Sequence, residues 1–286
     1  WTEPGVLGGP GVADMKGGLA VMLAALKAVE AGPFASRLGY EVVINSDEEV
    51  GSPGSAALIA AAAQGKRAAL TYEPAALPDG TLAGARPGSG NFSFVVTGRS
   101  AHAGRNPEDG RNAVVAAADL ALRLTAAEAP GLSVNVARMD GGGPNNVVPD
   151  HAVLRVNMRP VSEADQARAQ EIIAGTVAEV VARHEVAICV HGGFGRPPKP
   201  LDPGAERLFG LVQQAGADLG QPIRWQPSGG VCDGNNIAAE RVPVVDTMGV
   251  RGGKIHSMEE YLIVDSLAER AALSAVTILR LAAEAA

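Results

Sequence analysis

The sequence predicts an α/β protein in which a second domain interrupts the first. In the first 87 residues, short β-branched segments alternate with alanine-rich helical segments, as is typical of parallel strands connected by helices. Residues 88–197 instead have the order strand, helix, strand, strand, helix, strand, which is that of a ferredoxin-like domain. After the proline-rich segment 195–204, helices and strands alternate again. We therefore expect one discontinuous domain, residues 1–87 and 198–286, and an inserted domain, residues 88–197.

The first domain begins with elements that local sequence predicts directly. A helix is expected over residues 18–29, because apolar residues fill almost every turn and a glycine-proline pair follows. The segment "YEVVINS", residues 40–46, is short and β-branched and predicts a strand. Alanine content predicts a helix over residues 55–65. "RAALTYEP", residues 67–74, returns to a strand that its proline ends.

The inserted domain has its own succession of elements. In chain order we expect a strand at 90–98, a helix at 110–124, strands at 131–140 and 152–160, a helix at 163–183 and a strand at 185–192.

Composition and charge exclude several classes of protein. Hydrophobic residues make up 47% of the chain and charged residues 19%, a balance that excludes disordered and collagen-like classes. The net charge of -7 repels phosphate, so we expect small molecules or peptides as partners, and neither nucleic acid nor a membrane surface. No apolar run approaches the roughly 20 residues of a membrane span. Cys189 and Cys232 lie far apart without CxxC spacing, which predicts neither a zinc knuckle nor a disulfide framework.

The start of the sequence bears on its cellular location. The chain opens at Trp1 with neither an initiator methionine nor a signal-peptide pattern, so we expect a piece whose beginning is missing. The location is unknown. A cytoplasmic location is favoured, and a periplasmic or secreted one stays open, because the missing start would carry any export signal.

Three consecutive acids, Asp47, Glu48 and Glu49, follow the strand predicted at residues 40–46. A run of this kind is often a solvated strand end or a set of acids near the start of a helix. In open α/β sheets, however, ligands bind beyond the carboxyl ends of the strands, which is where these acids fall. Crowded carboxylates also repel one another, and a bound cation relieves that repulsion.

Three further side chains are expected at the same edge of the sheet. Asp14 precedes the first helix, Glu73 closes a strand, and His256 follows a strand and a glycine pair. Each also has an ordinary explanation: a helix cap or a partner for Lys16 in the case of Asp14, a surface acid for Glu73, and a hydrogen-bonded surface histidine for His256. Carboxylates with an imidazole suit zinc, cobalt or manganese, whereas calcium prefers more oxygens and no histidine. This set of ligands predicts a transition-metal hydrolase.

Six motifs occur in an order that is specific to one family. They are "GPGVADMKGG", "NSDEEVGSPGS", "YEP", "GRSAHAG", "NNVVPD" and "IHSMEEY". In this order the chain resembles the co-catalytic dizinc peptidases and deacylases, which include glutamate carboxypeptidase, acetylornithine deacetylase, succinyl-diaminopimelate desuccinylase and aminoacylase. The resemblance covers essentially the whole chain and is closest to the glutamate carboxypeptidase branch. It implies a zinc-peptidase-like catalytic domain with a central mixed sheet flanked by helices, and an inserted domain that serves as lid and dimerisation unit.

The resemblance also implies roles for the residues that match these motifs. Asp14 would bridge two divalent metal ions, with zinc expected first and cobalt or manganese as alternatives. Glu49, Glu73 and His256 would complete the metal ligands. Glu48 would be the general base for a metal-bridging hydroxide that attacks the amide carbonyl. Glutamate at the position of Glu73 goes with carboxypeptidases and deacylases in this family, which favours a substrate with a free carboxylate.

The same resemblance implies residues that contact the substrate. His102 would stabilise the oxyanion in the partner's active site of a homodimer, and Arg159 would clamp the terminal carboxylate of the substrate. Asn146 would contact the substrate, and Gly229 and Gly230 would line its pocket. Without the resemblance, His102 and Asn146 are ordinary turn residues and Arg159 is a charge at a strand end.

One departure from the family pattern leaves alternatives open. The His-x-Asp motif that supplies a metal-binding histidine has no counterpart before Asp14. The predicted function is hydrolysis of an amide or peptide bond beside a carboxylate-bearing residue, as in glutamate carboxypeptidase. An N-acyl-amino-acid deacylase is the alternative within the family. A non-catalytic dimer that binds amino acids or peptides is the alternative outside it, although the presence of Glu48 argues against a pure binder.

Overall fold

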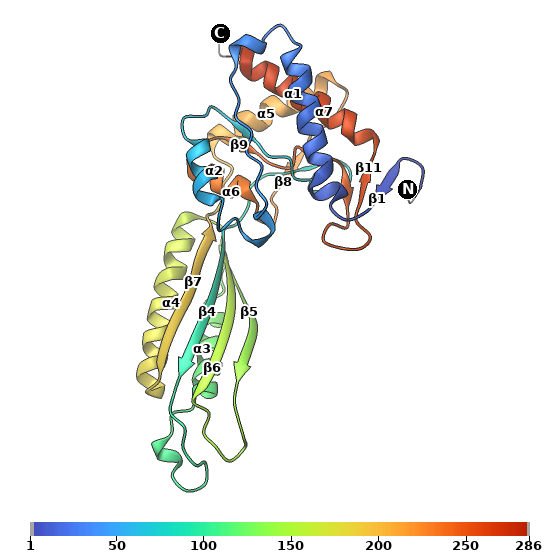
Figure 1. Cartoon of the computed structure of the whole chain (residues 1–286). Helices are drawn as coiled ribbons and strands as arrows, with labels where there is room; N and C mark the ends of the chain where they lie inside the picture. Colours follow the sequence, from blue (N-terminus) through green and yellow to red (C-terminus); the bar gives the residue numbers. More distant parts are fainter. Residues whose placement is uncertain (1–2, 285–286) are drawn as a thin grey trace. The chain divides into compact units, whose positions relative to one another are not determined.

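The computed structural model in Figure 1 describes residues 3–284, and Trp1, where the sequence opens, lies outside the described residues. The chain divides into two compact units. The residues up to Arg86 and those from Lys199 onward form the discontinuous unit, and Pro87–Pro198 form the inserted unit.

The inserted unit has the predicted element order, strand, helix, strand, strand, helix, strand. Its elements are β4 (Ser89–Thr97), α3 (Ala113–Ala126), β5 (Leu132–Gly141), β6 (His151–Pro160), α4 (Glu163–His184) and β7 (Ala187–Arg196). The four strands form one sheet in the order β5-β6-β4-β7, and every neighbouring pair is antiparallel.

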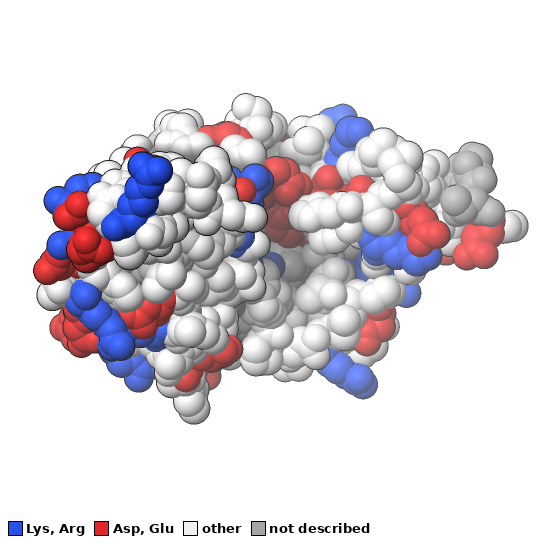
Figure 2. All heavy atoms as spheres, turned by 90° about the horizontal axis from the view of Figure 1, so that it is seen from below, with Lys and Arg blue, Asp and Glu red and all other residues white. Residues whose placement is uncertain are grey.

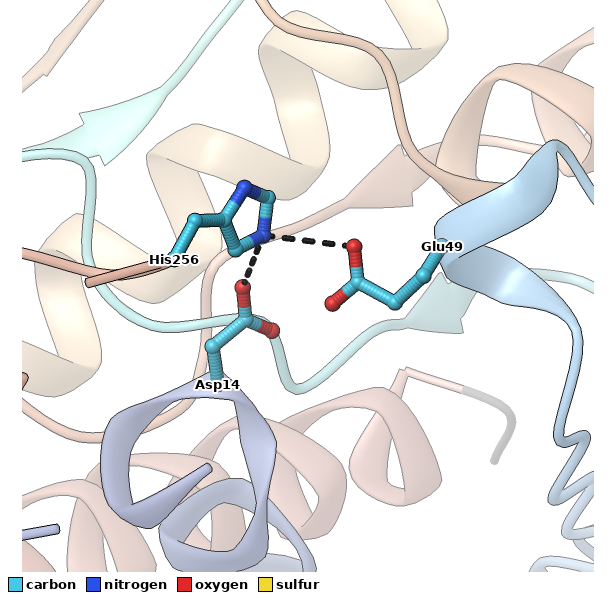
Figure 3. Close-up of side chains that lie close together, drawn as sticks. All are labelled: Asp14, Glu49 and His256. Carbon is cyan, nitrogen blue, oxygen red and sulfur yellow. Dashed lines mark hydrogen bonds and ion pairs between the residues drawn. The ribbon is translucent and has the colours of Figure 1, made fainter. Parts of the chain in front are cut away.

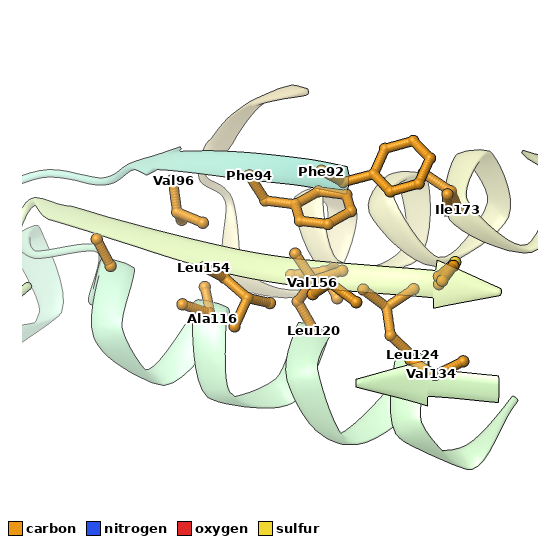
Figure 4. Packing of buried hydrophobic residues seen from close by; sticks show 14 of the residues in the cluster. Phe92, Phe94, Val96, Ala116, Leu120, Leu124, Val134, Leu154, Val156 and Ile173 are labelled. Atoms are coloured by element: carbon orange, nitrogen blue, oxygen red, sulfur yellow. The ribbon is translucent and has the colours of Figure 1, made fainter. Parts of the chain in front are cut away.

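The core of the inserted unit lies between one face of this sheet and the two helices. Along β4 and β6 every second residue is buried, as expected for strands with one face covered. Figure 4 shows Leu154 on the side of β6 that faces Ala116 and Leu120 of α3, and Phe94 of β4 belongs to the same buried cluster. Because α3 and α4 contact each other as well as the sheet, both helices cover the same face.

Capping side chains help to fix where three of the helices begin. The Asn112 side chain accepts a hydrogen bond from an N–H in the first turn of α3, and Ser162 does the same for α4. In the discontinuous unit, Asp202 caps α5 (Pro203–Asp218) through the N–H of Ala205. Each cap satisfies an N–H that has no partner within its helix.

The discontinuous unit mixes helices with short strands. Besides α5, its regular elements are β1 (Val6–Gly8), α1 (Gly18–Glu30), α2 (Ala56–Ala63), β2 (Ala69–Leu70), β3 (Leu82–Ala83), β8 (Trp225–Gln226), α6 (Asp233–Ala239), β9 (Val244–Val245), β10 (Gly252–Gly253), β11 (Tyr261–Ile263) and α7 (Asp265–Ala283). Two pairs are parallel, β2 with β9 and β3 with β8. The third sheet is antiparallel, in the order β1-β11-β10.

The prediction of a strand at residues 40–46 is wrong. The segment has no regular secondary structure, and within residues 3–284 it joins no sheet. Val42 and Ile44 are 44% and 68% exposed. A β-branched sequence favours an extended backbone, but a strand also needs a hydrogen-bonded neighbour, and no strand of the described residues pairs with this segment.

Helices α1, α5 and α7 enclose the core of the discontinuous unit. Helix α7 packs against both α1 and α5, and Figure 1 shows α1 and α7 side by side. Val21, Phe209 and Leu273, one from each helix, are fully or almost fully buried in the same cluster as Val250. Asp14 lies four residues before the first residue of α1, so the packing of this helix also limits where Asp14 lies.

Figure 2 shows charged side chains of both signs among uncharged residues on the face that it draws, and neither sign covers this face continuously. Over the described part of the chain, no helix is long and apolar enough to cross a membrane.

Two leucines of α3 test the packing of the inserted unit. Leu120 is fully buried and Leu122 is 72% exposed, so the same substitution by alanine has the same effect on helix propensity at two very different sites. We expect Leu120→Ala to lower the free energy of unfolding by about 2 to 5 kcal/mol through lost contacts and a cavity. Leu122→Ala should change it by less than about 0.5 kcal/mol. Urea unfolding at a fixed protein concentration measures both, and equal losses would contradict the packing.

Candidate metal centre

Asp14, Glu49 and His256 come together although they lie far apart in the sequence. One donor atom from each lies within 4.8 Å of the others. The Nε2 atom of His256 is 3.1 Å from Asp14 Oδ2 and 3.2 Å from Glu49 Oε2. Figure 3 shows the three side chains pointing toward one another from three separate segments of the discontinuous unit. Two carboxylates and one imidazole at this spacing form a set of donors suited to a transition-metal ion.

Glu48 and Glu73 line the same pocket as these three residues. The pocket has a volume of about 540 Å³, and all of its lining residues belong to the discontinuous unit. The structure thus brings the four predicted metal ligands and Glu48, the predicted general base, to one pocket.

The turn that carries Asp14 depends on close backbone approaches. It lies between β1 and α1, and Gly11 at its start has a left-handed conformation, with φ 72°, that glycine adopts without strain. At the first residue of α1, a Cβ on Gly18 would lie only 1.9 Å from the carbonyl oxygen of Tyr72. The absence of a side chain at Gly18 therefore lets the start of α1 lie directly on the segment that leads to Glu73.

The three consecutive acids divide into one structural residue and two that face the pocket. The Asp47 carboxylate accepts hydrogen bonds from the N–H groups of Gly54 and Ser55, at 2.7 and 3.1 Å, and from the Ser55 hydroxyl. The Ser55 hydroxyl is the main reason why the pKa of Asp47 lies below its usual value. Asp47 thereby shapes the turn, while Glu48 and Glu49 on the 3-10 turn Glu48–Val50 line the pocket.

Asn45 and Asp233 extend this support. The Asn45 side-chain amide donates to Asp233 Oδ2 at 2.9 Å and to the Ser55 hydroxyl at 3.0 Å. Asp233 also accepts from the Ser52 hydroxyl. The acidic turn is therefore tied to the first residue of α6. Asn45 and Ser52 were not predicted from the sequence, where their one signal is that they flank the acids.

Glu260 was also missed and holds the turn of Asp14. Its carboxylate accepts from the N–H groups of Gly11, Ala13 and Asp14, at 2.8, 2.9 and 2.9 Å. Burial alone would raise the pKa of Glu260, but these backbone hydrogen bonds outweigh it, and the pKa lies below its usual value. Its signal in the sequence is its position directly before the apolar strand that follows His256.

The carboxyl group of Glu73 is largely buried, close to two other carboxylates of the pocket. Burial raises the pKa of Glu73 to about 8, and the charges of Asp14 and Glu48 and a hydrogen bond with Asp14 contribute. The positive charge of Arg86 acts in the opposite direction. Divalent cations would relieve this repulsion, so both the electrostatics and the chemistry of the donors fit a metal centre.

A buried ionic cluster supports one wall of the pocket. The Arg86 guanidinium donates to both oxygens of Asp246, at 2.7 and 3.1 Å, and Lys199 Nζ lies 3.2 Å from the same carboxylate. Arg86 also donates to the carbonyl of Gly230 at 3.0 Å. Gly230 lines the pocket, and Gly229 precedes it in the same loop. Because Arg86 is fixed by Asp246, it fixes the course of that loop in turn.

The predicted substrate contacts of the inserted unit lie at opposite ends of its sheet. His102 forms an isolated backbone bridge with Val147, and the N–H of Ala103 donates to the carbonyl of Asn146. These two loops lie beyond the His151 end of β6, whereas Arg159 lies near its other end, roughly 25 Å away along the strand. Within one chain, His102 and Asn146 are neighbours, and Arg159 is remote from both.

Comparison with known proteins agrees with the motifs. The model of peptidase family M20/M25/M40 matches residues 2–280. Carboxypeptidase G2 of Pseudomonas sp. (strain RS-16) is 31% identical over 282 residues, which cover 96% of this chain and 67% of that protein. Succinyl-diaminopimelate desuccinylase of Pseudomonas syringae pv. syringae (strain B728a) is 28% identical over 279 residues, which cover 93% of this chain and 71% of that protein.

A solved structure shows the same fold. The tripeptidase SAV1512 from Staphylococcus aureus subsp. aureus mu50 has a TM-score of 0.77 at 22% identity, with 99% of this chain and 75% of that chain covered. The fold and the convergent acidic and imidazole side chains define a hydrolase of peptide or related amide bonds. The chain belongs to peptidase family M20/M25/M40, and the resemblance found in its motifs is confirmed.

The raised pKa of Glu73 predicts how the stability of the metal-free protein depends on pH. Between the usual value of 4.5 and about 8, the folded state keeps a proton on Glu73 that the unfolded state releases, so the free energy of unfolding falls as pH rises. Glu73→Gln removes this pH-dependent contribution to the free energy of unfolding. Relative to wild type, the variant should gain stability from pH 5 to pH 8, by at most about 1.4 kcal/mol per pH unit.

Thermal unfolding in the presence of a chelator measures this difference. Glu206→Gln is the control, because Glu206 is an exposed glutamate on α5. The assignment is wrong if the difference between Glu73→Gln and wild type is the same at both pH values.

Proposed function

We propose that this chain is a metal-dependent hydrolase that cleaves an amide or peptide bond beside a carboxylate-bearing residue. The observation that carries the proposal is the convergence of Asp14, Glu49 and His256 within 4.8 Å, in a pocket that Glu48 and Glu73 also line. A surface cluster of acids would not include a largely buried glutamate whose pKa is raised by burial and by neighbouring carboxylates.

Four side chains would hold two divalent ions, with zinc expected first and cobalt or manganese as alternatives. Asp14 contacts both His256 and Glu73, which suits a carboxylate that bridges two ions. Glu49 adds an oxygen near His256. When bound, such ions polarise the substrate carbonyl and lower the pKa of a water molecule toward neutrality.

Glu48 would move the proton. It follows Asp47, whose hydrogen bonds shape the turn, and it lines the pocket beside Glu49. A carboxylate in this position would accept a proton from the attacking water and deliver it to the leaving amine. The buried Arg86–Asp246 pair would keep the Gly230 loop in place while the substrate binds.

The substrate class is inferred from the relatives and from Glu73. A relative at 31% identity is named carboxypeptidase G2, and glutamate at position 73 goes with carboxypeptidases and deacylases in the resemblance described above. We therefore propose a free carboxylate next to the scissile bond, of the glutamate type. Deacylation of an N-acyl amino acid is the second candidate, because a relative at 28% identity is named as a desuccinylase.

His102 is proposed to act in a homodimer. Since His102 and Arg159 lie near opposite ends of β6, one chain would not bring both to a single small substrate. If Arg159 clamps the substrate carboxylate in its own chain, the oxyanion donor of that site would be the partner's His102. The inserted unit would then serve two active sites.

Glu48→Gln tests the general base. We expect kcat for a glutamate-terminated dipeptide or an N-acyl glutamate to fall by about 10²- to 10⁴-fold, because the amide accepts no proton at neutral pH. Zinc content, measured by atomic emission after dialysis, should stay at the wild-type level. Asp14→Ala is the contrasting variant, because it should lose bound zinc together with activity. Normal turnover in Glu48→Gln would contradict the assignment.

Mixing two inactive variants tests the role of His102 across the dimer. His102→Ala alone should lose about 10²- to 10³-fold in kcat. In a mixed dimer with Glu48→Gln, the site of the His102→Ala chain keeps its own Glu48 and receives the partner's His102, so co-expressed chains should be more active than either variant alone. If His102 acts within its own chain, the mixture should stay as inactive as its components.

A further inference from the structure

The loop that precedes β11 supplies one candidate metal ligand and also a side chain that supports a second candidate ligand. His256 and Glu260 lie in the loop that enters β11, while Asp14 lies 246 residues before Glu260 in the sequence. Strand β1 pairs with β11, with Gly8 opposite Tyr261, and the N–H of Gly9 donates to the carbonyl of Glu260 at 3.0 Å. The ladder therefore brings the carboxylate of Glu260 to the turn that carries Asp14.

The carboxylate of Glu260 is bound almost entirely by backbone. Its side chain is 5% exposed, its Oε2 accepts from Gly11, and its Oε1 accepts from Ala13 and Asp14. Consecutive N–H groups that surround one anion form a cavity of positive potential, and hydrogen bonds to a charged acceptor are stronger than neutral ones. Without the carboxylate, three N–H groups of an irregular turn would lack these partners.

The loop from Lys254 to Glu260, which carries His256, is compact and internally hydrogen-bonded. Lys254 and His256 have left-handed backbone conformations, with φ of 54° and 61°. The Ser257 hydroxyl donates to the carbonyl of Lys254, and the N–H of Glu260 donates to the carbonyl of Ser257 at 3.3 Å. This compact loop connects His256 to Glu260 over only four residues, so what fixes Glu260 also limits where His256 lies.

We propose that Glu260 is a positioning residue that sets the separation between Asp14 and His256 by holding the backbone of Asp14. The proposal rests on the proposed function, since the separation matters because both side chains would bind metal. Glu260 itself is not a ligand in this arrangement, because its carboxylate faces the backbone of the turn and lies in neither the donor cluster nor the lining of the pocket. In the neighbouring residue, Oε2 of Glu259 lies 2.6 Å from Nζ of Lys254, and the Glu259 side chain is 72% exposed.

Glu260→Gln and Glu259→Gln are the matched test, since they remove the same charge from adjacent residues. In Glu260→Gln one amide oxygen can still accept from Ala13 and Asp14, but the amide NH₂ faces the N–H of Gly11. We expect zinc affinity, measured by competition with a chromophoric chelator, to fall about 10- to 100-fold. Glu259→Gln should stay within about twofold of wild type. Glu260→Ala should lose more than Glu260→Gln.

Two other measurements separate positioning from general stability. Hydrogen exchange of the metal-free protein, followed by NMR, should show lost protection at Gly11, Ala13 and Asp14 in Glu260→Gln, with the core helices unchanged. With zinc at saturation, kcat should fall, because the geometry of the metal-binding side chains is altered. KM should stay within about twofold, because the residues that contact the substrate are unchanged.

The proposal is overturned if Glu260→Gln binds zinc as wild type does, or if it loses protection throughout the discontinuous unit. Absence of zinc binding by wild type would instead refute the proposed function. In that case the exchange measurement alone decides whether Glu260 orders the turn. Protection retained in Glu260→Gln would reject that role, and loss confined to the turn would support it.

Discussion

The constraint on which the site depends is the crowding of carboxylates in one partly buried pocket. Glu73 is largely withdrawn from water, and the charges of Asp14 and Glu48 add to the energetic cost of ionising it. Unpaired charges in such a place oppose folding. Arg86 offsets part of this cost, but its guanidinium is already bound to both oxygens of Asp246. The remaining negative charge is what the proposed divalent ions would neutralise.

Two further acids, Asp47 and Glu260, hold the turns that carry the pocket carboxylates. Asp47 and Glu260 resemble the pocket acids in type but turn toward backbone N–H groups, which take up their charge. The acids that shape the turns thus face backbone N–H groups, whereas Asp14 and Glu49 face His256 in the pocket. Neighbours in sequence such as Asp47 and Glu48 differ in role because the 3-10 turn after Asp47 directs their side chains differently.

The parts of the structure that were predictable are those that local sequence determines. The elements of the inserted unit were predicted because alternation and helical periodicity report burial on one face. Residues 40–46 were not, because a strand depends on a neighbour that its own sequence does not contain. The convergence of Asp14, Glu49 and His256 was expected from the order of the motifs. Glu260 escaped notice because its contacts are with backbone N–H groups in a turn about 250 residues away, and a backbone contact leaves no residue type to recognise.

The two connections between the units leave the discontinuous unit side by side. Arg86 and Lys199 form a reciprocal pair of backbone hydrogen bonds, both at 2.9 Å, and both side chains are buried against Asp246. One buried carboxylate, that of Asp246, therefore anchors both points at which the chain leaves and re-enters the discontinuous unit. Its loss would leave two buried cations without their shared anion and would loosen both crossings at once.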